Sequence, residues 1–156
     1  MKTLIMYESI HHCNTKKIAK VMAEVLNAKL IKCNKVNINK LYKYDLIGFG
    51  SGIYFGKHHE NLLNLIDKIP LMKNKKAFIL ATSGVGNGIL QLPYCCDFNR
   101  LLKKKLLEKG FDIIGKFSCR GYDTNGLLKY IGGISKGRPN EKDLENARNF
   151  AKNLRR

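Results

Sequence analysis

Residues 1–20 read MKTLIMYESIHHCNTKKIAK, and this stretch decides the fold of the chain. Segment 3–7 is an apolar run of strand length. From Asn14 onward the apolar residues recur at the spacing of one helical face: Ile18, Val21, Met22, Val25 and Leu26. We therefore expect a buried strand that runs into a helix through the polar loop 8–14.

Hydrogen-bonding side chains gather where this loop meets the helix. They are Ser9, His11, His12, Asn14 and Thr15. A helix N-terminus also presents unpaired backbone N–H groups, which suit an anion. Lys16 and Lys17 occupy the first turn, where the helix dipole alone favours acidic residues. A bound anion would offset that arrangement, although two solvated lysines are the simpler explanation of the lysines taken alone.

Four further apolar segments have the length of strands and alternate with helical patterns. They are 29–33, 45–50, 77–82 and 113–119. Strands that alternate with helices predict an α/β fold with a doubly wound five-stranded parallel sheet, order 2-1-3-4-5, and helices on both faces. Ligands of such sheets bind beyond the carboxyl ends of the strands, between the first and the third. The loop 120–139, which precedes a helix capped by Asn140, is long enough to suggest a function.

The length and composition narrow the class of protein. A chain of 156 residues has the size of one domain, which we expect to span 1–156. No apolar run approaches the ~20 residues that span a bilayer, and no secretory signal is recognisable, so a cytoplasmic location is expected. Five cysteines without C-x-x-C spacing indicate reduced thiols, with Cys95-Cys96 the one pair close enough for a strained bridge.

The charge is unusual, because 29 basic and 12 acidic residues give a net charge of +17. Such an excess attracts nucleic acids, anionic membranes or acidic proteins. The basic residues are spread over the whole chain, and no aromatic residues interleave with arginines. No specific nucleic-acid binding is therefore expected.

All four histidines lie in two loops, as the pairs His11-His12 and His58-His59. Histidine is a common transition-metal ligand, so a metal site is an alternative reading of these loops. Adjacent histidines do not by themselves aim both rings inward. We therefore expect no metal site here.

The first loop contains neither a Walker A motif nor a Rossmann fingerprint. It resembles the FMN phosphate loop of the flavodoxin family, in which an aromatic residue, a Ser or Thr, and then Gly-Asn-Thr open a helix that continues with Ala. Tyr7, Ser9, Asn14, Thr15 and Ala19 match that pattern, and Cys13 stands at the glycine position. The loop is one residue longer than the common form. We expect this residue to reshape the turn so that Cys13 needs no positive φ.

Two later loops extend the resemblance over the whole chain. The segment 50–56 is similar to the family loop whose aromatic residue covers the isoalloxazine ring, and the segment 82–84 to the loop that borders its pyrimidine edge. The resemblance thus implies a single flavodoxin-like domain with these cofactor-binding residues: Ser9, His11, His12, Cys13, Asn14, Thr15, Ser51, Gly52, Ile53, Tyr54, Phe55, Gly56, Thr82, Ser83 and Gly84. Tyr54 or Phe55 would be the stacking residue.

The leading hypothesis is an FMN-binding electron-transfer protein whose redox partner has an acidic face. The alternative is a flavin-dependent oxidoreductase of the quinone or protoporphyrinogen oxidase type on the same fold, with the loop 120–139 closing over a substrate through Tyr122, Asp123 and Tyr130. A basic interaction module without cofactor is the third hypothesis. No acid–base pair in the sequence identifies a catalytic residue.

Overall fold

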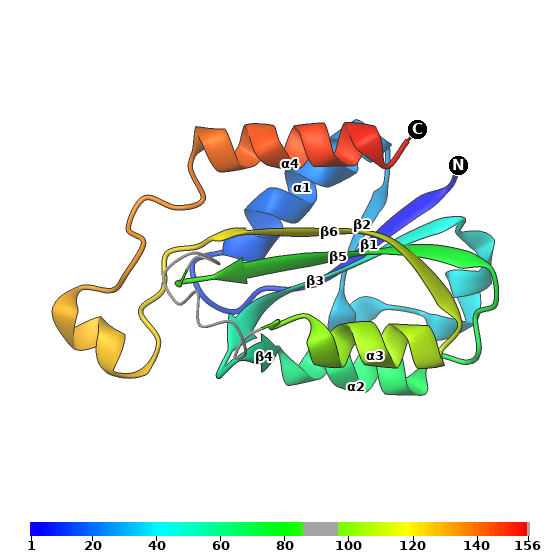
Figure 1. Cartoon of the computed structure of the whole chain (residues 1–156), viewed down its shortest axis with the longest axis horizontal. Helices are drawn as coiled ribbons and strands as arrows, with labels where there is room; N and C mark the ends of the chain where they lie inside the picture. The colour runs from blue at the N-terminus through cyan, green and yellow to red at the C-terminus, as the bar shows by residue number, and fades with distance from the viewer. Residues whose placement is uncertain (86–96, 156) are drawn as a thin grey trace.

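The computed structural model describes residues 1–85 and 97–155, and within them five parallel strands form one twisted sheet (Figure 1). The strands are β1 (Thr3–Glu8), β2 (Lys29–Lys32), β3 (Leu46–Tyr54), β5 (Lys75–Ser83) and β6 (Phe111–Arg120). Their spatial order is β2-β1-β3-β5-β6. Counted along the chain, the parallel strands therefore lie in the order 2-1-3-4-5, and the predicted doubly wound α/β fold is confirmed.

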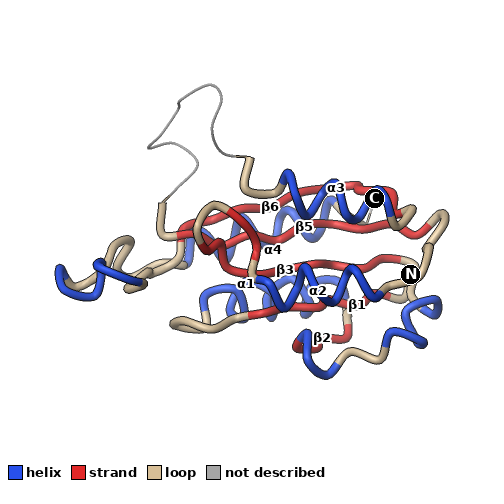
Figure 2. Tube along the Cα trace, turned by 90° about the horizontal axis from the view of Figure 1, so that it is seen from below, coloured by secondary structure: helices blue, strands red, loops and turns tan. Residues whose placement is uncertain are grey.

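Two layers of helices cover the sheet (Figures 1 and 2). α1 (Asn14–Leu26) and α4 (Glu141–Asn153) lie on one face, and α2 (Glu60–Lys68) and α3 (Arg100–Glu108) lie on the other. Short 3-10 helices, which the sequence did not predict, connect β2 to β3: η1 (Cys33–Lys35) and η2 (Ile38–Lys43). None of the helices in the described ranges is long and apolar enough to cross a membrane.

Alternate residues of each strand belong to different hydrophobic cores, because successive side chains point to opposite faces of a sheet. In β1, Ile5 packs in the core under α1 and α4, whereas Leu4 and Met6 pack in the core under α2 and α3. The same alternation in β3 places Phe49 under α2 and α3. Ser51, two residues further on, therefore points toward α2 and α3 and away from α1.

The third strand is longer than predicted. The strand predicted over 45–50 extends to Tyr54, because β3 continues into an antiparallel hairpin with β4 (Lys57–His58). Phe55 and Gly56 form its turn, with φ angles of 50° and 78°. Positive φ at both central residues is typical of a type I′ turn, which favours Asn-Gly. Gly56 suits this turn, and Phe55 does not.

The chain from 121 to 139, here called the arm, connects β6 to α4 and extends beyond the end of the sheet (Figure 1). It contains η3 (Gly126–Ile131), and a single antiparallel bridge joins Asp123 to Ile134 at its base. The arm ends at Asn140, whose side chain accepts a hydrogen bond from the Asp143 N–H in a capping box. The predicted N-cap of the last helix is therefore confirmed.

Candidate functional site

The loop between β1 and α1 leads into a helix N-terminus without a side-chain cap. α1 begins at Asn14, and its N-cap residue Cys13 makes no side-chain hydrogen bond to the first turn. No acidic residue lies in that turn. His12 and Cys13 both have positive φ, at 52° and 55°. The N-terminal N–H groups of α1 are thus left without a side-chain cap and remain available to a negatively charged ligand.

The expectation about Cys13 was wrong. The additional loop residue does not remove the need for a positive φ, because His12 and Cys13 adopt the left-handed conformation in succession. Side chains with a Cβ are disfavoured there, which is the reason glycine is usual at this position of the family loop.

We expect Cys13→Gly to raise the free energy of unfolding by up to about 1 kcal/mol, because glycine relieves the left-handed strain. Urea denaturation of the parent chain and the variant measures this difference. Cys13→Ala is the matched control, since it also removes the exposed thiol but retains the Cβ. An equal gain from both substitutions would show that the thiol, and not the backbone, is responsible.

Ser9 Oγ in the loop and Asn14 Oδ1 at the start of α1 are buried and have no hydrogen-bond partner among residues 1–85 and 97–155. A buried polar group without a partner costs roughly 1–3 kcal/mol, so such atoms mark places where a ligand can contribute the missing bond. The other end of the Asn14 amide is engaged, because Nδ2 donates to the Tyr122 carbonyl at 2.7 Å. The residues of this loop therefore fit a ligand that carries a phosphate and further polar groups.

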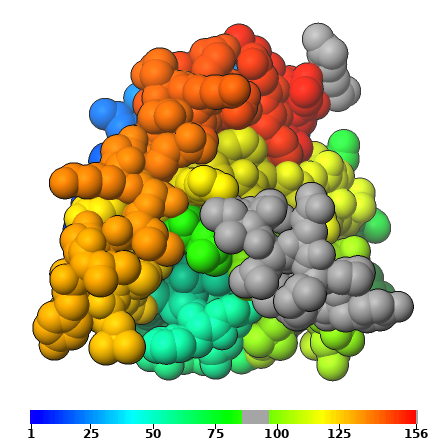
Figure 3. Space-filling model, turned by 60° about the vertical axis from the view of Figure 1, so that its left-hand side comes forward, coloured from blue at the N-terminus to red at the C-terminus, as the bar shows by residue number. Residues whose placement is uncertain are grey.

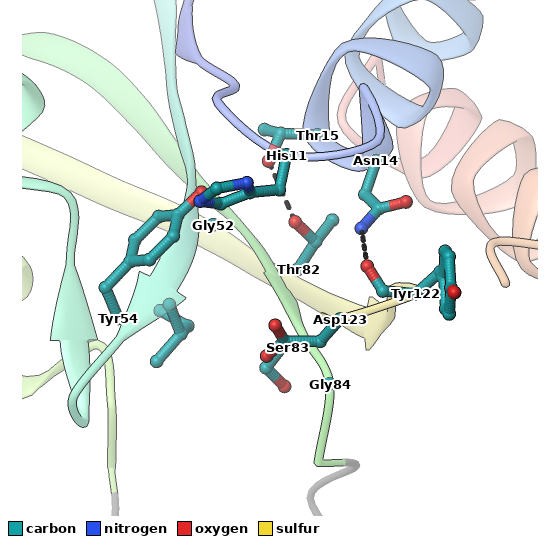
Figure 4. Close-up of a pocket in the computed structure, with 11 residues that line it drawn as sticks. His11, Asn14, Thr15, Gly52, Tyr54, Thr82, Ser83, Gly84, Tyr122 and Asp123 are labelled. Atoms are coloured by element: carbon teal, nitrogen blue, oxygen red, sulfur yellow. Dashed lines mark hydrogen bonds between the residues drawn. The ribbon is translucent and has the colours of Figure 1, made fainter. Parts of the chain in front are cut away.

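A pocket opens beside the loop, at the carboxyl ends of β1, β3 and β5 (Figure 4). The Thr15 hydroxyl, from the first turn of α1, lies 2.8 Å from the Thr82 hydroxyl at the end of β5. Nine of the predicted cofactor residues line the pocket: His11, Asn14, Thr15, Gly52, Ile53, Tyr54, Thr82, Ser83 and Gly84. The three predicted loops therefore meet at one site.

Tyr54 is the predicted stacking residue that lines this pocket. Its ring lies over Gly52, where an added Cβ would come within 2.9 Å of the ring. The ring also lies 6.0 Å from that of His11 and 5.2 Å from that of His59. Burial raises the pKa of the Tyr54 phenol. The free volume of the pocket is only about 20 Å³, enough for one water. His11 and Tyr54 also line an adjoining cavity of about 410 Å³.

Six predicted residues do not line the pocket: Ser9, His12, Cys13, Ser51, Phe55 and Gly56. Ser51 is fully buried and points toward α2 and α3, while Phe55 is 96% exposed at the hairpin turn. His12 faces the arm, where its Nε2 lies 2.8 Å from Thr124 Oγ1 and its ring lies 4.3 Å from the Tyr122 ring. Of the two candidate stacking residues, the structure brings only Tyr54 to the pocket.

The arm contributes two pocket residues that were not predicted for the cofactor, Tyr122 and Asp123. Gly84 makes this approach possible, because a Cβ there would lie 2.5 Å from Asp123 Cβ. Only the length of the loop 120–139 pointed to these residues in the sequence.

A buried polar network lies behind the pocket, under α2 and α3. Ser51 Oγ is 2.8 Å from His58 Nδ1, and His58 Nε2 is 2.9 Å from Asn99 Oδ1. The His59 N–H also donates to Ser51 Oγ, at 3.1 Å. Burial lowers the pKa of His58 to about 4, so the ring is neutral near pH 7. This network joins the end of β3, β4, the start of α2 and the start of α3.

The described cysteines are free, and two of them are protected. Burial raises the pKa of both the Cys33 and the Cys119 thiol to about 12, which makes them unreactive as nucleophiles. The Cys95-Cys96 pair lies outside the described residues. Within 1–85 and 97–155, no group of three or more His, Cys, Asp or Glu side chains is placed to hold a metal ion.

Comparison with known proteins agrees with this architecture. An uncharacterized protein of Methanocaldococcus jannaschii is 49% identical over 155 residues, which are 99% of this chain and 98% of that protein. The structure of a flavodoxin from the domain Archaea has a TM-score of 0.69 at 16% identity, covering 99% of this chain and 96% of its own. Oxidised Flavodoxin 2 from Bacillus cereus has a TM-score of 0.68 at 22% identity, covering 97% and 95%.

These two structures, at such low identities, support the fold alone. A family model described as a flavodoxin domain matches residues 4–117, which are most of the chain. The chain belongs to the flavodoxin family.

Proposed function

We propose that this protein binds FMN in the pocket of Figure 4 and transfers electrons. Flavodoxins generally bind a flavin, usually FMN. The observation that carries the proposal is the uncapped N-terminus of α1, preceded by two left-handed residues and by the Ser9 hydroxyl, which has no hydrogen-bond partner within the described part of the chain. This arrangement suits the phosphate of FMN better than a neutral ligand.

Each part of the site has a role in this proposal. Ser9 and Thr15, together with the first N–H groups of α1, would bind the phosphate, and the exposed His11 and His12 would lie beside it. Asn14 Oδ1 would accept a hydrogen bond from a hydroxyl group of the ligand. Tyr54 would pack beside the ring, and the backbone of 82–84 would border its polar edge. FMN supplies one- and two-electron redox chemistry when bound, while the protein supplies binding, orientation and electrostatics.

Titration with FMN and with riboflavin, followed by flavin absorbance and fluorescence, tests the proposal. Riboflavin has the same ring but no phosphate, so FMN should bind more tightly if the loop 9–15 holds the phosphate. Equal affinities for the two flavins would contradict the assigned loop. Binding of neither flavin would overturn the proposal and favour a basic interaction module without cofactor.

An FMN-dependent oxidoreductase on the same fold is the second candidate. Tyr122 and Asp123 favour it, because the arm places both side chains at the pocket and could border a substrate there. Turnover of a quinone or of protoporphyrinogen by the FMN-loaded protein would distinguish an enzyme from a carrier. A carrier should instead exchange electrons with a partner protein and show no steady-state turnover of either compound.

The partner of a carrier should have an acidic face, given the net charge of +17. Lys57, which is exposed at the hairpin, adds positive charge close to Tyr54. At ~8 Å and an effective dielectric of about 20, one cation stabilises a negative charge by about 2 kcal/mol before screening. Positive charge beside the pocket therefore favours the reduced, anionic form of a bound flavin.

We expect Lys57→Glu to lower the reduction potential of bound FMN by several tens of millivolts, since about 1.4 kcal/mol corresponds to ~59 mV for one electron. Spectroelectrochemical titration measures the shift. Lys152→Glu makes the same charge change at the exposed end of α4 and should leave the potential close to that of the parent chain. Equal shifts in both variants would show that the reduction potential responds to the net charge of the chain and not to the charge of Lys57 beside the pocket.

A further inference from the structure

Four large apolar side chains of the described residues are much more exposed than the others. They are Phe55 (96%), Leu127 (83%), Tyr130 (76%) and Ile131 (73%), whereas the next, Tyr42, is 62% exposed. All four belong to two segments, the β3–β4 hairpin turn and η3 of the arm. Both segments follow the carboxyl end of a strand, the hairpin turn after β3 and η3 after β6 (Figure 1).

The two segments are neighbours in space. Asn125, which directly precedes η3, lines the same cavity of about 410 Å³ as Phe55 and the half-exposed Ile10. Figure 3 shows the arm and the hairpin side by side on one face of the molecule. The exposed apolar side chains are therefore carried by two adjacent segments, which we take together as one surface.

The folding of the chain does not account for this surface. Phe55 has a φ of 50° at a turn position that favours asparagine or glycine, and its ring makes almost no contact with the protein. η3 contains no buried residue. Exposed apolar side chains that are grouped in this way mark an interaction site.

Positive charge accompanies the apolar side chains. Lys57 stands beside the hairpin turn, and Lys129 and Lys136 are exposed on the arm. The Lys129 ammonium lies 5.0 Å from the centre of the Tyr130 ring, so an aromatic body and a cationic head lie together at the tip. Aromatic and aliphatic side chains among lysines are typical of protein segments that lie in the interface of an anionic membrane.

We propose that the hairpin turn and η3 bind the surface of an anionic lipid bilayer. Phe55, Leu127 and Ile131 would enter the interfacial layer while the lysines contact the head groups. A bilayer accepts apolar side chains on projecting segments without a matching groove, which a rigid protein partner would need. The net charge of +17, spread over the chain, attracts the extended negative surface of an anionic bilayer.

This surface borders the pocket, so binding would turn the pocket toward the bilayer. If the proposed FMN function is correct, the electron donor or acceptor is then a molecule held in or at the membrane. That consequence depends on the proposed function, but the lipid binding does not.

Co-sedimentation with vesicles of phosphatidylglycerol and phosphatidylcholine, compared with pure phosphatidylcholine vesicles, tests the proposal. The parent chain should bind the anionic vesicles more tightly, and less so as salt is raised. The double variant Phe55→Ser/Leu127→Ser should reduce the partition coefficient by about tenfold or more, because two buried apolar side chains are lost from the interface. Leu71→Ser/Leu107→Ser is the matched control, since both leucines are more than half exposed elsewhere on the molecule.

Three results would overturn the proposal. One is equal binding of the parent chain to both kinds of vesicle, or to neither. Another is an equal loss of binding in the two double variants. The third is a concentration-dependent dimer, seen by light scattering without lipid and abolished by Phe55→Ser/Leu127→Ser, which would assign the surface to a second copy of this chain. Since the assay measures lipid binding and not flavin, its failure would leave the proposed function untouched.

Discussion

Replacing Thr15 by alanine is expected to weaken FMN binding by about tenfold or more, because a hydrogen bond to a charged group contributes roughly 1.5–3 kcal/mol. Thr15 is buried in the first turn of α1, and its hydroxyl lies 2.8 Å from that of Thr82. With the Thr82 hydroxyl as donor, the Thr15 hydroxyl is free to donate to a phosphate. Isothermal titration with FMN measures the loss.

Two variants separate the ligand contact from the packing of this site. Thr15→Ser retains the hydroxyl and should bind FMN nearly as the parent chain does. Thr82→Val removes the neighbouring hydroxyl while Thr15 stays in place, so its effect should be smaller than that of Thr15→Ala. An unchanged affinity in Thr15→Ala, or the same loss in all three variants, would contradict a phosphate contact by Thr15.

The second large effect is expected in the dependence of stability on pH. Burial lowers the pKa of His58 to about 4 from an ordinary 6.5, so between these values the unfolded chain binds one proton more than the folded chain at this residue. The stabilisation is complete above pH 6.5 and is lost as the pH falls toward 4. Integrated over this range, it is about 3 kcal/mol of the free energy of unfolding.

The surroundings of His58 are consistent with a neutral ring in the folded protein. Nε2–H can donate to Asn99 Oδ1, and Nδ1 of the neutral ring then accepts from the Ser51 hydroxyl. The Gly52 carbonyl, also 2.8 Å from Ser51 Oγ, competes with Nδ1 for the single hydroxyl hydrogen. Asp97 is the nearby charge that favours protonation, and burial outweighs it. Protonation would place a positive charge on the His58 ring, which is 1% exposed. The neutral side chains of Ser51 and Asn99 would compensate this buried charge poorly.

Urea denaturation at a series of pH values between 7 and 4 measures the effect. Carboxyl groups also titrate in the lower part of this range, so the informative quantity is the difference between the parent chain and His58→Gln. The variant should be less stable at pH 7, because its polar network is altered, and should lose less stability on acidification. His11→Gln replaces an exposed histidine and is the control. Equal changes in pH dependence for both variants would contradict the role of the buried ring.

The sequence was sufficient to predict the order of the strands, because it depends on features that are local in the chain. Apolar runs of strand length alternate with helical patterns, and parallel strands joined by helices allow few arrangements. The junction of β1 and α1 was equally readable, since its loop and helix are continuous in sequence. The predictions that were wrong concern the backbone, such as the length of β3 and the φ of Cys13, where pairing between strands and the closing of a loop decide the conformation.

The composition of the pocket was predictable in part. Residues of three loops meet there because the carboxyl ends of neighbouring parallel strands lie at one edge of the sheet. The direction of each side chain was not predictable to the same degree. Successive residues of β3 face opposite sides of the sheet, so Ser51 faces His58 and Gly52 lies on the side of Tyr54. A shift of β3 by one residue would exchange these sides, and the pairing with β1 and β5 sets the register.

The sequence by itself determined the doubly wound sheet, the membership in the flavodoxin family and the place of the anion loop, since these depend on patterns within short stretches of the chain. Only the tertiary structure decided that Tyr54 and not Phe55 lies at the pocket, that the arm brings Tyr122 and Asp123 to it, and that His58 is buried. These contacts join residues that are far apart in the chain. They depend on strand register, on the course of the arm and on burial, which the order of residue types does not contain.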